Sequence, residues 1–283
     1  MCMSFRREAM AIEKEFYRSL LKSSLSLSER EKIAKSLLHV VRTSNDDKWQ
    51  YIKSKHDHYD HALLKIRENG YIKLSLSNSS DIASSIQRLS SAQDVDSEFN
   101  SSKSQAIYLS GVEKLEPVKK LLTDQSLHEL VSLYLGAPAS LYKTLAWWQY
   151  PTDSDCKPSN AQLWHRDRDD FSFLKFFMYC TDVDLSSGPH AFLPKTHLSS
   201  SLPSLFSSNV SNNPLVNGST HHFLSDFDLQ NLGYAGQKKV WVGPAGTCFL
   251  EDTRGFHRAY VPTMKPRLIF SLVWTVGPGF EPL

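Results

Sequence analysis

The stretch RLIFSLVWTV (267–276) is one of six short apolar runs in the second half of the chain. All six are rich in aromatic and β-branched residues, and Gly, Pro or Asp residues separate them. Several short strands without intervening helices predict an antiparallel sandwich or barrel. The other five runs are LYKTLAWWQY (141–150), FSFLKFFMYC (171–180), HAFLP (190–194), KKVWV (238–242) and GTCFLE (246–251).

Before residue 140 the sequence has the periodicity of helices. Ser28 with Glu31 three residues later has the pattern of a capping box, and Ser126 with Glu129 repeats it. Between these two predicted helix starts, Gly70 precedes the apolar stretch YIKLSL (71–76). That pattern predicts a turn followed by a first strand. The order is therefore helices first and a β-core second.

Composition bounds the class of protein. The chain has 283 residues, 41% of them hydrophobic, and a formal net charge of +2, which does not favour a nucleic-acid partner. No apolar run approaches the ~20 residues that cross a bilayer. The charged start MCMSFRREAM lacks a signal-peptide core, and the four cysteines form no CxxC pair. We expect a soluble cytoplasmic protein with reduced thiols and no membrane partner.

The stretch WHRDRDDF (164–171) allows two interpretations. His-Arg-Asp is the start of the protein-kinase catalytic loop, which also needs an Asn five residues after the Asp and a later Asp-Phe-Gly. Here Ser172 stands five residues after Asp167, no Asp-Phe-Gly follows, and no glycine-rich phosphate loop is present. The kinase interpretation is therefore excluded.

The second interpretation is a metal site. His165 and Asp167 are one residue apart, so on an extended segment both side chains point to the same side. Two histidines and one carboxylate occupy one face of Fe(II) and leave the other positions open. His257, just after a turn at Gly255, is the candidate third ligand. Arg267, ten residues later, heads the last strand and could hold a carboxylate.

With these residues in place, the chain resembles the phytanoyl-CoA dioxygenase family of Fe(II)/2-oxoglutarate-dependent oxygenases over about residues 62–276. The resemblance rests on ALLKIRENGYIKL (62–74), WHRD (164–167), SSGPHAFLPKTH (186–197) and GTCFLEDTRGFHRAY (246–260), followed by Arg267. It implies a mainly β fold, a double-stranded β-helix (jelly-roll, cupin-like) core with flanking helices. The chain departs from the family pattern at Lys195-Thr196, where Gly-Ser is usual, and at Ala259, where some members carry Ser.

The resemblance also implies roles for individual residues. His165, Asp167 and His257 would bind the catalytic iron. Arg267 would bind the distal carboxylate of 2-oxoglutarate, with Gln149 as a further polar contact to this co-substrate. As a separate hypothesis, the substrate pocket would include three residues near the ligands: Arg166, Gln162 and His190.

The function so implied is conversion of 2-oxoglutarate and O2 to succinate and CO2, coupled to hydroxylation of a small molecule. Asp167 argues against a halogenase, which replaces this carboxylate with a smaller residue. Desaturation, ring closure and epimerisation use the same ligands and stay open. So do two other classes: a cupin-type metal enzyme that needs no 2-oxo acid, and a non-catalytic barrel that acts as a binding module. The chain would be a monomer or a homodimer.

Three regions follow from this interpretation. Residues 1–61 lie outside the resemblance and would form a helical extension packed on the core. Residues 62–283 would form the oxygenase domain. Within it, the Ser- and Asn-rich region 197–236 has no regular period, which is typical of a lid or an inserted loop. A second His-x-Asp, His58-Tyr59-Asp60, precedes a helical segment, and we interpret it as a solvated helix start.

Overall fold

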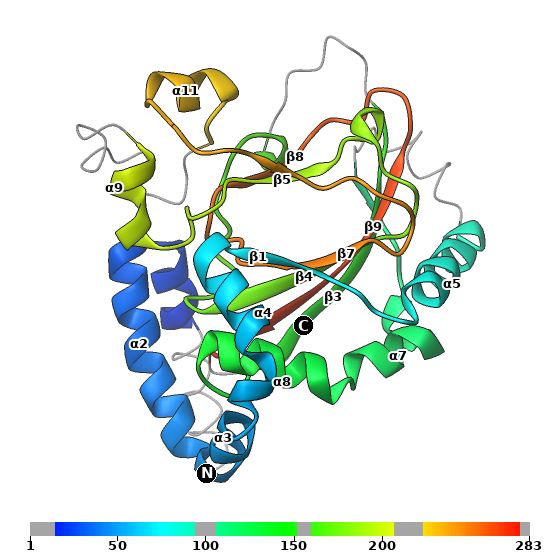
Figure 1. Ribbon diagram of the computed structural model, residues 1–283. Helices are drawn as coiled ribbons and strands as arrows, with labels where there is room; N and C mark the ends of the chain where they lie inside the picture. Colours follow the sequence, from blue (N-terminus) through cyan, green and yellow to red (C-terminus); the bar gives the residue numbers. More distant parts are fainter. Residues whose placement is uncertain (1–14, 94–105, 152–159, 207–222, 278–283) are drawn as a thin grey trace.

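The core of the protein consists of two antiparallel β-sheets that face each other (Figure 1). The computed structural model describes residues 15–93, 106–151, 160–206 and 223–277. The larger sheet has the strand order β1-β7-β4-β9-β3-β2 and the smaller sheet the order β6-β5-β8. The predicted mainly β jelly-roll core with flanking helices is confirmed. The strands are β1 (Tyr71–Leu74), β2 (Ala106–Tyr108), β3 (Ser140–Gln149), β4 (Phe173–Tyr179), β5 (His190–Phe192), β6 (Lys239–Val240), β7 (Cys248–Glu251), β8 (His257–Ala259) and β9 (Arg267–Thr275).

Helices cover the outer face of the larger sheet (Figure 1). Residues 15–22 are also helical. The covering helices are α2 (Leu27–Ser44), α3 (Asp46–Lys53), α4 (His56–Asn69), α5 (Ser79–Ser91), α7 (Glu116–Leu122) and α8 (Gln125–Leu135). Shorter elements join the strands: η1 (Val112–Lys114), η2 (Asn160–Gln162), η3 (Leu185–Ser187), η4 (Ser199–Ser201), α9 (Leu202–Leu205) and α11 (Asp226–Asn231).

Alternation along the central strands divides the larger sheet into two chemically different faces. Every second residue of β9 joins the apolar core beneath the helices: Leu268, Phe270, Leu272 and Trp274. The residues between them face the space between the sheets: Arg267, Ile269, Ser271 and Val273. Each apolar side chain buried on the helix side stabilises the fold by about 1.5–3 kcal/mol. The helix-covered face therefore holds the sheet, and the inner face is left for chemistry.

The cap of α2 corrects one prediction. Ser26, not Ser28, is the N-cap, and its partner in the capping box is Glu29, not Glu31. The Ser26 amide donates to the Glu29 carboxylate at 2.8 Å. The sequence SLSERE contains the Ser-x-x-Glu pattern twice, and starting the helix at the earlier copy buries Leu27.

The cap of α8 corrects a second prediction. Asp124 is the N-cap and accepts a hydrogen bond from the Leu127 amide at 2.8 Å, so Ser126 lies inside the helix. Glu129 instead accepts a hydrogen bond from a tertiary partner, the hydroxyl of Tyr59, at 2.9 Å. The helix ends at Gly136 in the left-handed conformation (φ 85°).

The predicted turn at Gly70 is confirmed. Gly70 ends α4 with φ 86°, and β1 begins at the next residue. A Cβ atom at Gly70 would lie 2.7 Å from the ring of Phe192 and 2.8 Å from His197. A side chain at this position would therefore be strained both by the backbone conformation and by close contact.

The N-terminal segment is attached to the loop that follows His165-Arg-Asp167. The hydroxyl of Tyr17 donates to the carboxylate of Asp170, and Arg30 donates to the backbone carbonyl of Asp170 at 3.2 Å. The Arg30 guanidinium also lies 4.7 Å from the centre of the Phe171 ring. The predicted boundary between residues 61 and 62 falls inside α4.

Region 197–236, the predicted lid or insert, contains η4, α9 and α11 in its described parts, 197–206 and 223–236. Residues 207–222 lie outside the described residues. Leucines of the described parts pack with Trp164 in a second apolar cluster: Leu202, Leu224, Leu229 and Leu232. This region therefore lies against the segment that carries His165.

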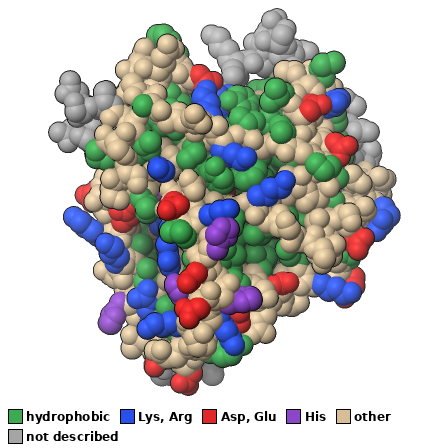
Figure 2. Space-filling view, viewed as in Figure 1, with side chains coloured by type: hydrophobic (Ala, Val, Ile, Leu, Met, Phe, Trp, Pro, Cys, Tyr) green, Lys and Arg blue, Asp and Glu red, His purple; other side chains and the backbone are tan. Residues whose placement is uncertain are grey.

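On the face shown in Figure 2, acidic and basic side chains are interspersed rather than gathered into a patch of one sign. None of the helices that the structure describes combines the length and apolar character needed to span a bilayer.

Candidate active site

A cavity of about 370 Å³ lies between the two sheets. Strands β3, β4 and β9 of the larger sheet and β5 and β8 of the smaller sheet contribute to its wall. Six of the eight predicted site residues line it: His165, Asp167, His257, Arg267, Gln149 and His190. The fold therefore brings together residues that are more than a hundred positions apart in the sequence.

Backbone pairing sets the positions of the first two candidate ligands. The amide of His165 donates to the carbonyl of His257, and the amide of His257 donates back, both at 3.0 Å. The amide of Asp167 donates to the carbonyl of Thr253 at 2.9 Å. The segment AQLWHRD (161–167) is not a regular strand: residues 160–162 form η2, and Trp164 and His165 form single bridges, each to a different segment.

The three candidate ligands converge on one point. The Asp167 carboxylate has one oxygen 3.6 Å from Nε2 of His165 and the other 3.2 Å from Nε2 of His257. One donor atom from each residue lies within 4.8 Å of the other two. Donors about 2.1 Å from one ion and at right angles to each other lie about 3 Å apart. The spacing therefore fits one divalent cation.

Both imidazoles have the tautomer that a metal ligand needs. Nδ1 of His165 lies 2.9 Å from the carbonyl of Leu163, and Nδ1 of His257 lies 3.1 Å from the carbonyl of Gly255. A carbonyl can only accept, so each Nδ1 carries the proton and each Nε2 has its lone pair free for a metal. Burial also lowers the pKa of His257, against the opposing attraction of Asp167.

A buried lysine that the sequence interpretation missed lies beside the ligands. Nζ of Lys175 is 2.6 Å from Asp167 and 2.7 Å from Asp169. Burial alone would raise the pKa of Asp167, but the charges of Lys175 and His257 hold it well below its ordinary value. The signal was present, because Lys175 is the single charge in the apolar run FSFLKFFMYC.

Arg267 is a buried cation that has no anionic partner among the described residues. It is 1% exposed, and its terminal nitrogens donate to the carbonyl of Gly188 and the side-chain oxygen of Gln149. Among the described residues no carboxylate lies within ion-pair distance of Arg267, and its Nε has no hydrogen-bond partner. Burial lowers the pKa of Arg267. A buried charge of this kind is costly unless it is paired, so the end of the cavity at Arg267 is suited to an anionic ligand.

His190 lies on the cavity wall beside His257, with ring centres 5.6 Å apart. Its Nε2 is 2.7 Å from the carboxylate of Glu251, whose other oxygen accepts from the indole of Trp241 at 3.2 Å. Burial raises the pKa of Glu251 to about 8 and holds that of His190 well below its ordinary value. Sequence reasoning did not find Glu251, although it is the single charge in the apolar run GTCFLE.

Two predicted substrate contacts do not line the cavity. The guanidinium of Arg166 lies 4.1 Å from the centre of the Phe256 ring and donates to the carbonyl of Thr196 at 3.3 Å. As the residue between two ligands on an extended segment, Arg166 points away from them. Gln162 is buried at the end of η2, beside the wall rather than in it. The structure gives both residues packing positions.

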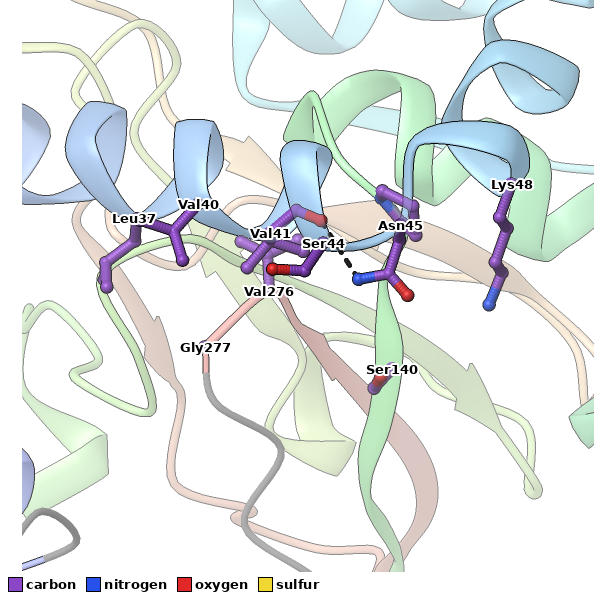
Figure 3. A pocket seen from close by; sticks show the side chains of 10 residues that line it. Leu37, Val40, Val41, Ser44, Asn45, Lys48, Ser140, Val276 and Gly277 are labelled. Atoms are coloured by element: carbon purple, nitrogen blue, oxygen red, sulfur yellow. Dashed lines mark hydrogen bonds between the residues drawn. The ribbon is translucent and has the colours of Figure 1, made fainter.

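A second cavity of about 360 Å³ lies between α2 and the ends of β3 and β9 (Figure 3). Figure 3 shows Leu37, Val40 and Val41 of α2 opposite Val276 and Gly277. The residues lining it include no histidine, aspartate, glutamate or cysteine. Of these two cavities, the one between the sheets is therefore the one that carries metal-ligating side chains.

Comparison with known proteins identifies the fold. No family model matches the chain, and no curated protein matches its sequence, so the resemblance to the phytanoyl-CoA dioxygenase family is not confirmed.

Among solved structures, the chain is similar to a non-heme α-ketoglutarate-dependent epimerase, SnoN of nogalamycin biosynthesis, with a TM-score of 0.51 and 16% identity over 77% of this chain and 83% of the other. It is also similar to EctD from S. alaskensis with bound Fe, with a TM-score of 0.52 and 17% identity over 78% of this chain and 79% of the other. A structure of EctD with 2-oxoglutarate and 5-hydroxyectoine gives a TM-score of 0.52 and 17% identity over 76% and 75%. The chain therefore shares the jelly-roll fold of these enzymes.

Proposed function

We propose that this protein is an Fe(II)/2-oxoglutarate-dependent oxygenase that hydroxylates a small molecule. One observation carries the proposal: a buried arginine that has no carboxylate partner among the described residues lines the same cavity as two histidines and a carboxylate that could hold one metal ion. The likeness in fold to an α-ketoglutarate-dependent epimerase and to EctD with bound Fe supports it.

The residues of the cavity fit the metal. Two imidazoles and one carboxylate form the donor set typical of non-heme Fe(II) oxygenases. His165 and His257 are held by backbone carbonyls with Nε2 toward Asp167. The three donors come from one side of the cavity, which leaves other coordination positions open.

The residues also fit the co-substrate. Arg267 would hold the distal carboxylate of 2-oxoglutarate, and Gln149 fixes the guanidinium by accepting one of its hydrogen bonds. When bound, iron and 2-oxoglutarate supply the oxidising chemistry with O2, giving succinate and CO2 along with the oxidised product. The buried wall around Arg267 excludes water from this end of the cavity.

The carboxylate of Asp167 favours hydroxylation over halogenation, because it occupies the position that a halide needs. Desaturation, ring closure and epimerisation remain alternative outcomes at the same site. A cupin-type enzyme that needs no 2-oxo acid would leave the charge of Arg267 unpaired, so the arrangement favours the 2-oxoglutarate enzyme. A non-catalytic binding module would not need the open coordination positions.

The test uses anaerobic protein loaded with Fe(II). Addition of 2-oxoglutarate should produce a visible charge-transfer absorption, and exposure to O2 should release succinate in proportion to enzyme even without substrate. Asp167→Ala should lose both signals, whereas Arg267→Met should need far more 2-oxoglutarate to produce them. Iron binding without any succinate release would point to the cupin-type alternative.

A further inference from the structure

The carboxylate of Asp167 has two oxygens in different surroundings. Oδ1 faces Nε2 of His165 at 3.6 Å. Oδ2 lies 3.2 Å from Nε2 of His257 and also accepts a charged hydrogen bond from Nζ of Lys175 at 2.6 Å. A carboxylate can bind a metal through one oxygen or through both, and only the first mode leaves the neighbouring coordination position free.

Lys175 is fixed in this position by a chain of ion pairs. Its side chain is 14% exposed, and Nζ is also 2.7 Å from Oδ2 of Asp169. The other oxygen of Asp169 lies 2.7 Å from Nζ of Lys143, whose side chain is 38% exposed. The two lysines flank Val273 of β9 on the adjacent strands β3 and β4. Asp167 and Asp169 therefore hold the buried ammonium together.

A lone pair that accepts a charged hydrogen bond is less available to a metal. Lys175 therefore weakens Oδ2 as a donor and leaves Oδ1 as the better one. The same ammonium also repels a divalent cation bound next to Asp167. Lys175 therefore lowers the affinity of the site for a metal ion. Its presence is not explained by stabilisation of the bound metal.

We propose that Lys175, anchored by Asp169, is a positioning residue that restricts Asp167 to coordination through one oxygen and so keeps a metal position open for the co-substrates. The inference rests on the proposed function, because it requires a metal at His165, Asp167 and His257. Without Lys175, Asp167 would bind through both oxygens, with tighter metal binding and one position fewer for water or co-substrate.

Mn(II), added alone to the full-length protein, reports both quantities. The electron paramagnetic resonance signal of free Mn(II) gives the dissociation constant. The relaxation rate of solvent water protons per bound ion scales with the number of waters on the metal. For Lys175→Met we expect at least about tenfold tighter Mn(II) binding and a relaxation rate per bound ion lower by about one third, the loss of one of three open positions.

Two further variants separate positioning from the overall electric field. Lys175→Met with Asp169→Asn removes one positive and one negative charge, so it preserves the net charge and does not leave a charged Asp169 without Lys175. It should keep the drop in relaxation rate while showing a smaller gain in affinity. Lys143→Met removes an ammonium from Asp169 without touching Asp167, and it should change neither quantity by more than about twofold.

An unchanged relaxation rate in both Lys175 variants, with wild-type circular dichroism, would overturn the inference. So would weaker Mn(II) binding in both, because that result marks Lys175 as a purely structural support. If the wild-type protein binds neither Mn(II) nor Fe(II), the proposed function itself fails. Binding that is lost in His257→Ala but unaffected by Lys175→Met removes only the positioning role.

Discussion

Two clusters of histidine and aspartate in this protein have similar composition and opposite surroundings. His165, Asp167 and His257 come from distant parts of the chain and meet in a cavity, with 13%, 20% and 5% of their side chains exposed. The second cluster lies within about one turn at the start of α4, with 42%, 102% and 60% exposed: His56, Asp57 and Asp60. In both, donor atoms lie within 4.8 Å of one another.

The comparison shows that short distances between donors do not make a metal centre. On α4, water competes for every donor, and exposed side chains would lose conformational entropy on binding an ion. In the cavity, backbone carbonyls orient both imidazoles, and the side chains are ordered before a metal arrives. The cavity also holds Arg267, a cation with no carboxylate beside it in the described part of the chain, whereas the α4 cluster is internally paired through His56 and Asp60 at 2.8 Å.

The largest expected effect comes from removing a ligand of the cavity cluster, with the α4 cluster as the control. Asp167→Ala or His257→Ala should lower iron-dependent succinate formation at least about 100-fold, since even groups that only support ligands contribute 10–100-fold. His56→Ala and Asp60→Ala should retain full activity and iron content. Loss of iron in the α4 variants would contradict the distinction between the clusters.

The second effect sharpens the role of the unpaired cation. Arg267→Met should raise the KM for 2-oxoglutarate about 10–100-fold, equivalent to the roughly 1.5–3 kcal/mol of a charged hydrogen bond, while metal affinity changes little. Arg258→Met is the matched control, because Arg258 already has a carboxylate partner, Asp226, at 3.1 Å. Equal KM values in the two variants would rule out Arg267 as the co-substrate anchor.

The third effect measures how strongly burial disfavours the ionised form of Glu251, the partner of His190. Burial raises the pKa of Glu251 from 4.5 to about 8, so between these values the folded state binds more protons than the unfolded state. Stability should therefore fall as pH rises through this window, by up to about 1.4 kcal/mol per pH unit from this group. Glu251→Gln should remove that slope in urea unfolding followed at pH 5, 6.5 and 8. Glu116→Gln on the surface should keep it, and parallel profiles for wild type and Glu251→Gln would mean that Glu251 ionises normally.

The smallest effect belongs to the α4 pair. Asp60→Ala removes a half-exposed ion pair at i, i+4 spacing, which is worth roughly 0.3–0.5 kcal/mol. The midpoint of thermal unfolding should fall by no more than a few degrees at low salt, and the difference should vanish at high salt. A large, salt-resistant loss would show that this cluster has a structural function that its exposure does not suggest.

The sequence was sufficient for the features that depend on local pattern. The aromatic and β-branched residues of RLIFSLVWTV predicted a strand, and the structure shows one apolar face under the helices and one face in the cavity. The His-x-Asp pattern with His257 and Arg267 named four residues that line the same cavity.

What the sequence did not supply depends on register and on long-range pairing. The contact of Lys175 with Asp167, eight residues earlier, depends on the conformation of residues 168–172 between them, which no local pattern predicts. The cap of α2 was misplaced because SLSERE offers two equivalent starts, and tertiary burial of Leu27 favours the first. Arg166 was assigned to the substrate from its proximity in sequence to the ligands, although extended geometry turns it toward Phe256.

The attachment of Tyr17 and Arg30 to Asp170 has a practical consequence for how this protein is handled. A fragment trimmed to the part that resembles known oxygenases, starting near Ala62, would remove Tyr17 and Arg30, two of the partners of Asp170, and uncover the Phe171 ring. Asp170 lies three residues beyond Asp167, so trimming would remove contacts that fix the loop carrying this ligand. Shortened versions of the protein should therefore retain the leading helices, and an inactive short fragment would say nothing about the chemistry of the whole chain.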